Sequence, residues 1–370
     1  MSSALFVHTG EGAHSRRSVV ANLQASPAWS ALEAALLKFV GCGLEAFLAR
    51  FLGEHGSPQS PIVTTCINLL NADRWRGAGH RPALTLGHSI GEVAAAHAAA
   101  LLSVHDAVKV AHTLGHVGCQ IVGCMLHANM TRDELDAWSE KHPLCVAAVN
   151  GVASGSRALL LSVTLCGQSE HVEAWLAAHP DAKRLAPPHP WHHPNYIAVP
   201  SVHGHTFASL PEASALSSNA IAMFSANAAS ELAAGRVLRL DANYWRAWLT
   251  TPVDFLGALE SAAVHLGCAD CYLIETGAHD TLTAVAIATL ASRGVHVVGT
   301  AASMRRGQPD AFWEAQRSQL EARSLTSGPA ARGLTIVTAQ IATLLAASFR
   351  IADVSPDAPL MQSGLDSDDL

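Results

Sequence analysis

A short apolar run, a serine between two glycines and an alanine-rich stretch follow one another without a break around residue 89. Leu84-Thr85-Leu86 predicts a buried strand, and the alanine-rich stretch predicts a helix. Between them stands Gly87-His88-Ser89-Ile90-Gly91, whose two glycines permit the sharp turn that such a connection needs. A strand that passes through a glycine turn into a helix is typical of a parallel sheet covered by helices. We therefore expect an α/β fold.

The composition fits one large domain or two and excludes several classes of protein. Only 14 % of the 370 residues are charged, against roughly 25 % in an average soluble chain, which implies a well-filled core. The formal net charge is −7 and no Lys/Arg-rich run is present, which argues against nucleic acid as a partner. Neither a secretory signal nor a bilayer-spanning stretch is visible, so we expect a cytoplasmic protein with no membrane partner.

Eight cysteines are too few for a disulfide scaffold of this length. Only Cys268-Ala-Asp-Cys271 has the spacing of a metal or redox site, and it lacks a second pair or a nearby thioredoxin-like pattern. Because this segment leads into the apolar run Tyr272-Leu273-Ile274, we expect ordinary buried thiols in a reducing compartment.

The middle of the chain predicts a small subdomain, at about residues 124–190, inserted between two parts of the α/β core. Thr131 and Glu134 have the spacing of a capping box, in which each residue satisfies a backbone donor of the other, and so predict the start of a helix. The expected elements are a strand at 124–129, a helix from 131 to 138, strands at 144–149 and 158–163, a helix at 169–178 and a strand at 183–186. This β-α-β-β-α-β order is the ferredoxin-like unit.

Strands followed by helices are also predicted on either side of that unit. Residues 5–7 predict a buried strand that runs into the glycine loop Thr9-Gly10-Glu11-Gly12. The other expected elements are helical material at 17–54 and 244–266, strands at 219–225 and 272–275, and a helix at 281–292. Residues 324–333 are typical of a linker.

Ser89 is the candidate nucleophile. In a strand–turn–helix of this kind the serine hydroxyl is exposed, and the N-terminus of the next helix directs N–H groups and positive potential at a developing oxyanion. The alternative is a serine that only builds the turn.

A nucleophilic serine needs a base, usually histidine, and the candidates are densest at residues 187–194. This segment contains His189, His192 and His193 among several prolines, and its stiffness suits holding an imidazole in place. The alternatives are a metal site, for which no carboxylate partner or helical spacing is present nearby, and a surface loop without a role.

Several segments together resemble the acyl-CoA:acyl-carrier-protein transacylases, a family that includes the malonyl transacylases and the acyltransferase domains of polyketide synthases. Gly87 to Glu92 matches the family's G-H-S-x-G-E, and the other similar segments follow in the family's order between about residues 4 and 306. They are Phe6 to His14 (F-x-F-x-G-Q-G-A-Q), Ala147 to Gly151 (A-A-V-N-G), His189 to His192 (H-A-F-H), Tyr244 to Phe255 (Y-W…P-V-x-F) and Glu275 to His279 (E-x-G-P-H).

The resemblance implies a fold, an activity and a set of site residues. The fold would be an α/β-hydrolase-like parallel-sheet core with an inserted ferredoxin-like subdomain, in a domain that spans residues 1–323. The activity would be transfer of an acyl group from acyl-CoA, through an acyl-serine, to the phosphopantetheine thiol of an acyl carrier protein. Other polyketide synthase domains would be further partners, and no metal or redox cofactor would be needed. Ser89 would be the nucleophile and His192 its base, in a dyad oriented by a backbone carbonyl. The backbone N–H groups of Glu11 and Ile90 would form the oxyanion hole, and Asn150, His189 and Trp191 would lie at the substrate.

Three departures from the family bear on the substrate. Members that load carboxylated extenders carry an arginine at the position of Leu114, so we expect a non-carboxylated starter acyl group. The alternatives are malonyl, with His116 or another cation as substitute, and a degenerate domain. Glu11 stands where glutamine is usual and would oppose an oxyanion if its side chain were ionised beside it. Trp191 is larger than the family's phenylalanine and Pro190 replaces a small residue, which would reshape the pocket floor.

The segment 334–370 is similar to the beginning of an acyl carrier protein. Gly364-Leu365-Asp366-Ser367 resembles the phosphopantetheine attachment site, so Ser367 would carry that group if the carrier portion were complete. The helices that complete a carrier fold do not follow, and we expect a truncated carrier segment; an acidic tail without this role is the alternative.

Two further functions remain open at this stage. Water could deacylate the same acyl-serine, which would make the protein a serine hydrolase. The domain could also be a non-catalytic scaffold of a megasynthase, in which the altered positions reflect lost activity.

Overall fold

The computed structural model describes residues 3–18, 20–138, 142–153, 160–214, 221–227, 239–267, 270–309 and 311–326. It divides the chain into the units Met1–Arg317 and Ser318–Leu370, with the division inside the helix α12 (Ala311–Thr326). The carrier-like segment 334–370 with Ser367, most of the expected linker, and Cys268 lie outside the described residues. Within the described residues, no helix combines the length and apolar character needed to cross a membrane.

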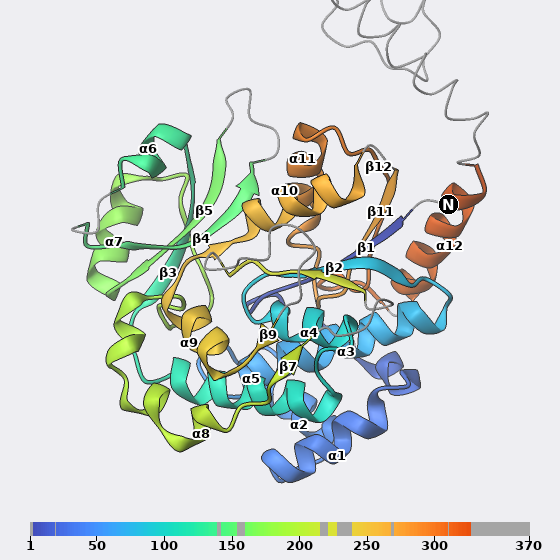
Figure 1. Cartoon of the computed structure of the whole chain (residues 1–370), viewed down its shortest axis with the longest axis horizontal. Helices are drawn as coiled ribbons and strands as arrows, with labels where there is room; N and C mark the ends of the chain where they lie inside the picture. Colours follow the sequence, from blue (N-terminus) through green and yellow to red (C-terminus); the bar gives the residue numbers. More distant parts are fainter. Residues whose placement is uncertain are drawn as a thin grey trace, which may run out of the picture. The chain divides into compact units, whose positions relative to one another are not determined.

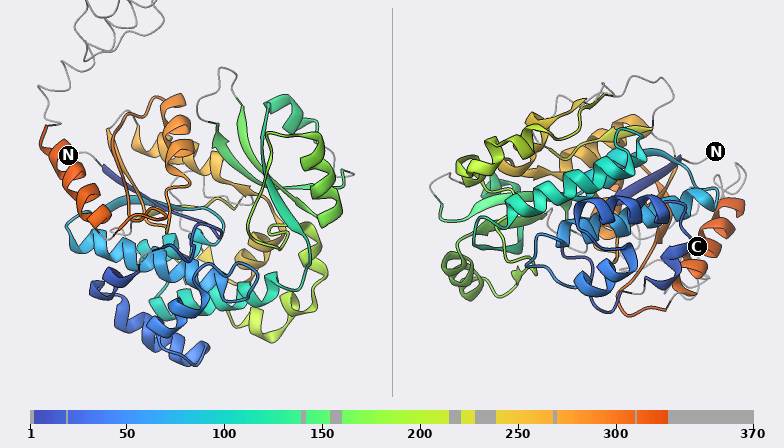
Figure 2. Two further views of the ribbon diagram at one scale, coloured as in Figure 1. Left: turned by 180° about the vertical axis from the view of Figure 1, so that it is seen from behind. Right: turned by 90° about the horizontal axis from the view of Figure 1, so that it is seen from below.

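A five-stranded parallel sheet forms the centre of the first unit, in the order β12-β11-β1-β2-β8. Its strands are β1 (Ser3–His8), β2 (Pro82–Gly87), β8 (Ala222–Phe224), β11 (Cys271–Glu275) and β12 (Val297–Ala302). Helices α10 (Phe255–Leu266) and α11 (Thr283–Ser292) cover one face, and α3 (Ser60–Gly77) and α4 (Gly91–Ala98) cover the other (Figures 1 and 2). The expected α/β fold with a parallel core is confirmed.

Successive side chains along each strand point to opposite faces of the sheet and pack into two different cores. Leu5, Val7 and Leu86 point to one face, where they pack with Phe255 and Leu259 of α10. The second core lies among the helices on the other side, which include α1 (Trp29–Phe39), α2 (Leu44–Phe51) and α5 (Val104–Gly118). Both faces of the sheet are therefore covered, as a parallel sheet requires.

The inserted subdomain has the predicted β-α-β-β-α-β order. Its elements are β3 (Cys124–Met130), α6 (Arg132–Asp136), β4 (Cys145–Val152), β5 (Leu161–Gly167), α7 (Ser169–Ala178) and β6 (Lys183–Arg184). The strands pair antiparallel in the spatial order β4-β5-β3-β6, which is the ferredoxin-like order, and β10 (Val253–Asp254) adds a parallel strand beside β4. The capping box of Thr131 and Glu134 is present at the start of α6.

Several element boundaries differ from those expected, and a glycine and a proline explain two of these differences. The helical stretch at 17–54 is three elements, η1 (Ala21–Ala25), α1 and α2, and Gly41 between the last two has a φ of 78° that a helix cannot contain. The stretch at 244–266 breaks at Pro252, which lacks an N–H, into α9 (Ala242–Thr250), β10 and α10. The strand expected at 158–163 corresponds to β5, which begins at Leu161 and ends at Gly167. The remaining elements are η2 (Pro194–Ala198), η3 (Pro200–His203), α8 (His205–Ala208), β7 (Ala213–Ser214) and β9 (Arg239–Leu240).

A buried polar network joins the carboxyl ends of three strands to α3. Asn68 of α3 accepts a hydrogen bond from the backbone N–H of Thr9 at 3.1 Å and donates one to the Thr9 carbonyl at 3.1 Å. Its Oδ1 also accepts from Thr276 at 2.8 Å, and Thr276 contacts His8, whose other ring nitrogen lies 2.8 Å from Thr85. Burial lowers the pKa of His8 to about 3, so the network holds no buried charge at neutral pH. It fixes the start of the loop that follows β1.

We expect Asn68→Ala to lower the free energy of unfolding by about 2–4 kcal/mol, because it leaves both backbone groups of Thr9 buried without a partner. Urea unfolding followed by circular dichroism measures this loss, and the exposed Gln24→Ala serves as a control that should stay within about 0.5 kcal/mol of the wild type. Equal stability of the two variants would contradict the role given to Asn68.

Candidate active site

The turn between β2 and α4 presents Ser89 at the carboxyl end of the parallel sheet. Ser89 has a φ of 51°, which is uncommon for a residue other than glycine and marks a strained, sharp turn. A Cβ added at Gly91 would lie 2.2 Å from the carbonyl oxygen of His8, and one at Gly87 would lie 2.2 Å from the N of Glu92. Both glycines are therefore needed for the chain to turn this closely, as the sequence predicts.

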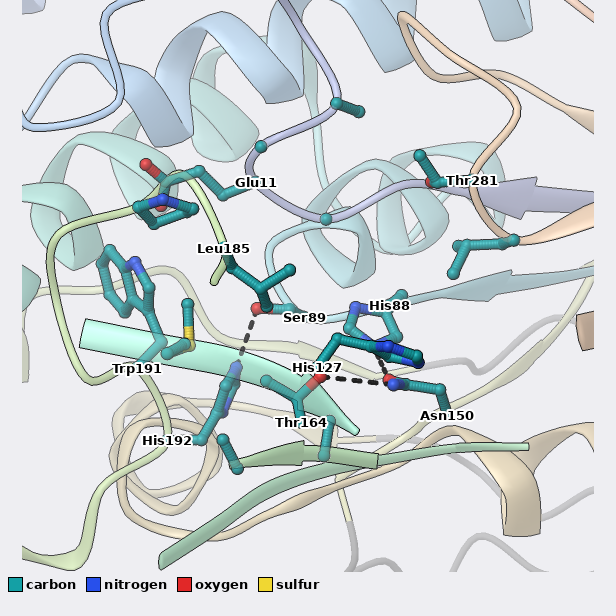
Figure 3. Close-up of a pocket in the computed structure, with 18 of the residues that line it drawn as sticks. Glu11, His88, Ser89, His127, Asn150, Thr164, Leu185, Trp191, His192 and Thr281 are labelled. Carbon is teal, nitrogen blue, oxygen red and sulfur yellow. Dashed lines mark hydrogen bonds between the residues drawn. The ribbon is translucent and has the colours of Figure 1, made fainter. Parts of the chain in front are cut away.

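The structure brings Ser89 and His192 together from segments far apart in the sequence. Ser89 Oγ lies 2.7 Å from Nε2 of His192, which is within hydrogen-bond distance (Figure 3). His192 lies between the prolines at 187–190 and η2, and has a φ of 61°. Of the three histidines in this segment, His192 is the one that contacts the serine, as the resemblance implied.

A backbone carbonyl orients the imidazole of His192. Its Nδ1 lies 2.8 Å from the carbonyl oxygen of Trp248 in α9, and only an N–H can bond to a carbonyl, so Nδ1 carries the proton. Nε2 is then the acceptor that faces the serine hydroxyl. The Trp248 ring packs on the imidazole with centroids 4.6 Å apart, and its Nε1 donates to the Ser89 carbonyl at 3.3 Å. One residue of α9 thus holds both partners.

Burial keeps His192 neutral. The side chain is 3 % exposed, and this desolvation lowers its pKa to about 4, although the hydrogen bond to the Trp248 carbonyl acts in the opposite direction. At neutral pH the imidazole is therefore an unprotonated acceptor toward Ser89. This is the state that a general base needs before the reaction.

A cavity of about 350 Å³ opens beside Ser89 and His192, between the parallel-sheet core and the inserted subdomain. Its walls come from five segments: the loop after β1, the turn at Ser89, the inner face of the small sheet, the segment 185–192, and the start of α11. The lining residues are Gly10, Glu11, Gly12, Ala13, His88, Ser89, Met125, His127, Ala147, Ala148, Asn150, Ser162, Thr164, Leu185, Ala186, Pro187, Trp191, His192, Thr281, Leu282 and Val285.

Asn150 and Trp191, both predicted at the substrate, line this cavity. Asn150 accepts a hydrogen bond from His88 Nε2 at 2.7 Å and donates to Thr164 at 3.2 Å. The indole of Trp191 lies against Gly118 of α5, where an added Cβ would come 1.9 Å from the ring. The larger aromatic ring is therefore accommodated by the missing side chain of Gly118.

Glu11 and Ile90 lie where two N–H donors to an oxyanion are expected, although that role remains a prediction. Ile90 directly follows Ser89 and precedes α4, and Glu11 lies in the cavity-lining loop after β1. Both carboxyl oxygens of Glu11 are buried without a hydrogen-bond partner, and its side chain extends away from Ser89 in Figure 3. Desolvation raises the pKa of Glu11 to about 8, so the carboxyl is mainly neutral at pH 7.

Three residues predicted at the substrate are not among those that line the cavity. Leu114 is fully buried and belongs to the same core cluster as Trp191. His116 follows it by two positions on α5, which turns its side chain to the exposed face of the helix. His189 Nε2 lies 3.3 Å from Cys119 Sγ. The role of Leu114 at the substrate therefore finds no support in the cavity lining and stays a prediction.

Two residues at the site, Trp248 and His127, were not predicted from the sequence. Trp248 has no motif of its own, and only the fold brings its carbonyl to His192. His127 lines the cavity from β3, two positions after Met125, which also lines it. Because side chains alternate along the predicted strand at 124–129, Met125 and His127 share one face, and this pattern could have identified His127. In the described parts of the chain, no group of three or more His, Cys, Asp or Glu side chains could hold a metal ion.

Comparison with known families agrees with this geometry. A family model described as the acyl transferase domain matches residues 59–330. The chain belongs to this family. Among curated relatives, it is 30 % identical over 283 residues to the highly reducing polyketide synthase cnsI of Penicillium expansum, a match that covers 70 % of this chain and 11 % of that one. It is 32 % identical over 247 residues to the highly reducing polyketide synthase fogA of Aspergillus ruber, covering 60 % and 10 %. The chain thus spans about a tenth of the length of these relatives.

Solved acyltransferase domains share its fold. A loading acyltransferase from the avermectin modular polyketide synthase superposes with a TM-score of 0.71 at 24 % identity, over 86 % of this chain and all of that one. The acyltransferase domain of the polyketide synthase PpsC of Mycobacterium tuberculosis gives a TM-score of 0.66 at 21 % identity, over 80 % and 91 %.

If Ser89 is acylated with His192 as its base, the lowered pKa of His192 predicts how the rate of acylation falls at acidic pH. We expect the rate of Ser89 acylation to be level between pH 5 and 7 and to fall only as the pH drops through about 4, where His192 gains a proton and stops accepting one. Rapid-quench acylation by acyl-CoA across this range measures the limb, with circular dichroism as a check on folding. A half-maximal rate near pH 6.5 would contradict a buried, neutral His192.

Proposed function

We propose that this acyl transferase domain moves an acyl group from acyl-CoA to the phosphopantetheine thiol of an acyl carrier protein, through an acyl-serine on Ser89. The observation that carries this proposal is the 2.7 Å contact between Ser89 Oγ and His192 Nε2 at the edge of a cavity. A hydroxyl paired with a neutral imidazole is the arrangement that activates a serine for attack on a thioester. The family and the polyketide synthase relatives support the same class of reaction.

In the first half-reaction, Ser89 Oγ attacks the thioester carbonyl while His192 Nε2 takes the hydroxyl proton. The Trp248 carbonyl stabilises the resulting imidazolium through Nδ1–H. The backbone N–H groups of Glu11 and Ile90 donate to the oxyanion, and its collapse breaks the C–S bond. His192 then protonates the departing CoA thiolate, which leaves Ser89 acylated and the imidazole neutral again.

In the second half-reaction, the carrier thiol attacks the acyl-serine, with His192 as the base that takes the thiol proton. Collapse of the second tetrahedral intermediate breaks the C–O bond and returns the proton to Ser89. Neither half-reaction calls for a metal or redox cofactor. The phosphopantetheine belongs to the carrier partner.

A non-carboxylated acyl group suits the cavity better than malonyl. None of the cavity-lining residues is lysine or arginine. The imidazoles of His88, His127 and His192 line it, but burial lowers the pKa of each, so none offers a stable positive charge at neutral pH. A carboxylate brought here would lose its hydration without gaining a cationic partner, which costs several kcal/mol. The support for a starter acyl group thus comes from the whole lining and no longer from Leu114.

Intact mass spectrometry tests the acyl-enzyme directly. After incubation with acetyl-, butyryl- or malonyl-CoA, we expect an adduct of the acyl mass that is absent in Ser89→Ala. Holo carrier protein should then remove the acyl group faster than water does. An adduct that persists in Ser89→Ala would contradict the nucleophile, while loss to water alone would favour a hydrolase. No adduct with any acyl-CoA would favour a scaffold.

The cation-free lining predicts the order of substrates. We expect acetyl- or butyryl-CoA to acylate Ser89 about 10- to 100-fold faster than malonyl-CoA at equal concentration, because only malonyl brings an unpaired carboxylate into the cavity. Competition between the two thioesters, read as the ratio of the two adduct masses, measures this preference. Faster acylation by malonyl-CoA would contradict it.

A further inference from the structure

Ser89 lies between two ends of the cavity that differ in polarity. Figure 3 shows Leu185 and Trp191 on one side of the serine and His88, His127 and Asn150 on the other. An acyl thioester held at Ser89 must extend in two directions, with the acyl group on one side of the reacting carbonyl and the thiol arm on the other. The two ends therefore present different surroundings to the two halves of the substrate.

The polar end is built as a chain of hydrogen bonds centred on Asn150. The amide of Asn150 donates to Ser162 Oγ at 3.3 Å and to Thr164 Oγ1 at 3.2 Å, and its Oδ1 accepts from His88. These contacts use both hydrogens of the amide and fix its orientation. Ser162 Oγ also lies 3.0 Å from Nε2 of His127, so the chain reaches from the residue beside the nucleophile to β3.

The chain leaves His127 with a donor for a ligand. Because Ser162 Oγ accepts from Asn150, its own hydrogen can bond to Nε2 of His127. In that arrangement the neutral ring carries its proton on Nδ1, and His127 lines the cavity. Burial and the neighbouring Lys183 ammonium lower the pKa of His127, so the ring is neutral at pH 7. A neutral N–H suits an uncharged acceptor, such as an amide carbonyl.

Burial indicates which half of the substrate each end takes. Trp191, at the apolar end, is only 4 % exposed, whereas His127, at the polar end, is half-buried. A short acyl group can be enclosed completely, but the thiol arm of CoA or of a carrier protein must pass to the solvent. The apolar end therefore suits the acyl group, and the polar end lies on the path of the arm.

We infer that His127 donates a hydrogen bond from Nδ1 to an amide carbonyl of the pantetheine arm that CoA and the carrier protein share, as the outermost donor of the chain built on Asn150. This inference rests on the proposed function, since it concerns the arm of the same thioester. His127 is thus a binding residue for the thiol half of the substrate, and the identity of the acyl group does not enter its role.

Substitutions of His127 combined with shortened thioesters test this assignment. The substrates are butyryl-pantetheine, which keeps both amides of the arm, and butyryl S-propyl thioester, which has none. His127→Phe keeps the ring but removes the donor, and His127→Asn keeps an N–H close to the position of Nδ1. His296→Phe is the matched control, because His296 is exposed and does not line the cavity. The quantity compared is the ratio of kcat/KM for Ser89 acylation by the two thioesters within each variant.

We expect His127→Phe to reduce this ratio about three- to tenfold by weakening only the reaction of the pantetheine substrate. His127→Asn should restore most of the ratio, and His296→Phe should leave it unchanged. Acylation by the S-propyl thioester shows that the Phe variant is folded and that the proposed nucleophile works. An unchanged ratio in His127→Phe would overturn the inference, as would an equal loss for both thioesters. Absence of any acylation in the wild type would instead contradict the proposed function.

Discussion

The hydrogen bond between His192 Nδ1–H and the Trp248 carbonyl is the contact on which the proposed chemistry depends. It fixes the tautomer, turns Nε2 toward Ser89, and would supply a fixed dipole for the imidazolium of the proposed proton transfer. A carbonyl performs this task without a buried negative charge. The imidazole therefore stays neutral in its desolvated position, in agreement with its lowered pKa.

Both members of the pair occupy backbone conformations that the fold must hold in place. Ser89 and His192 have positive φ angles, each of which costs on the order of 1–3 kcal/mol. Close packing of Gly91 against the His8 carbonyl stabilises the first, and the contacts of Trp248 connect the two. The network of Asn68 in turn anchors the end of β1, so the stability of the sheet core and the geometry of the site are linked.

Local patterns predicted the parts of this structure that depend on neighbouring residues. The turn at Ser89 and the capping box at Thr131 follow from short-range spacing, and both are present. The pairing of Ser89 with His192 spans 103 residues, and only the resemblance to a family selected His192 among its neighbours. The resemblance to the family also placed Leu114 at the substrate, whereas the structure buries it in the same core cluster as Trp191, which no local pattern reveals. Trp248 orients the imidazole of His192 through its backbone carbonyl, which any residue type supplies, so no sequence pattern marked this contact.

The rate of Ser89 acylation after removal of the imidazole tests the central claim most directly. Rapid-quench mass spectrometry with acetyl-CoA compares the wild type with His192→Ala and His192→Gln at pH 7. If His192 is the base, both variants form the same Ser89 adduct about 10²- to 10⁴-fold more slowly. A loss of less than tenfold in both would show that another group takes the serine proton.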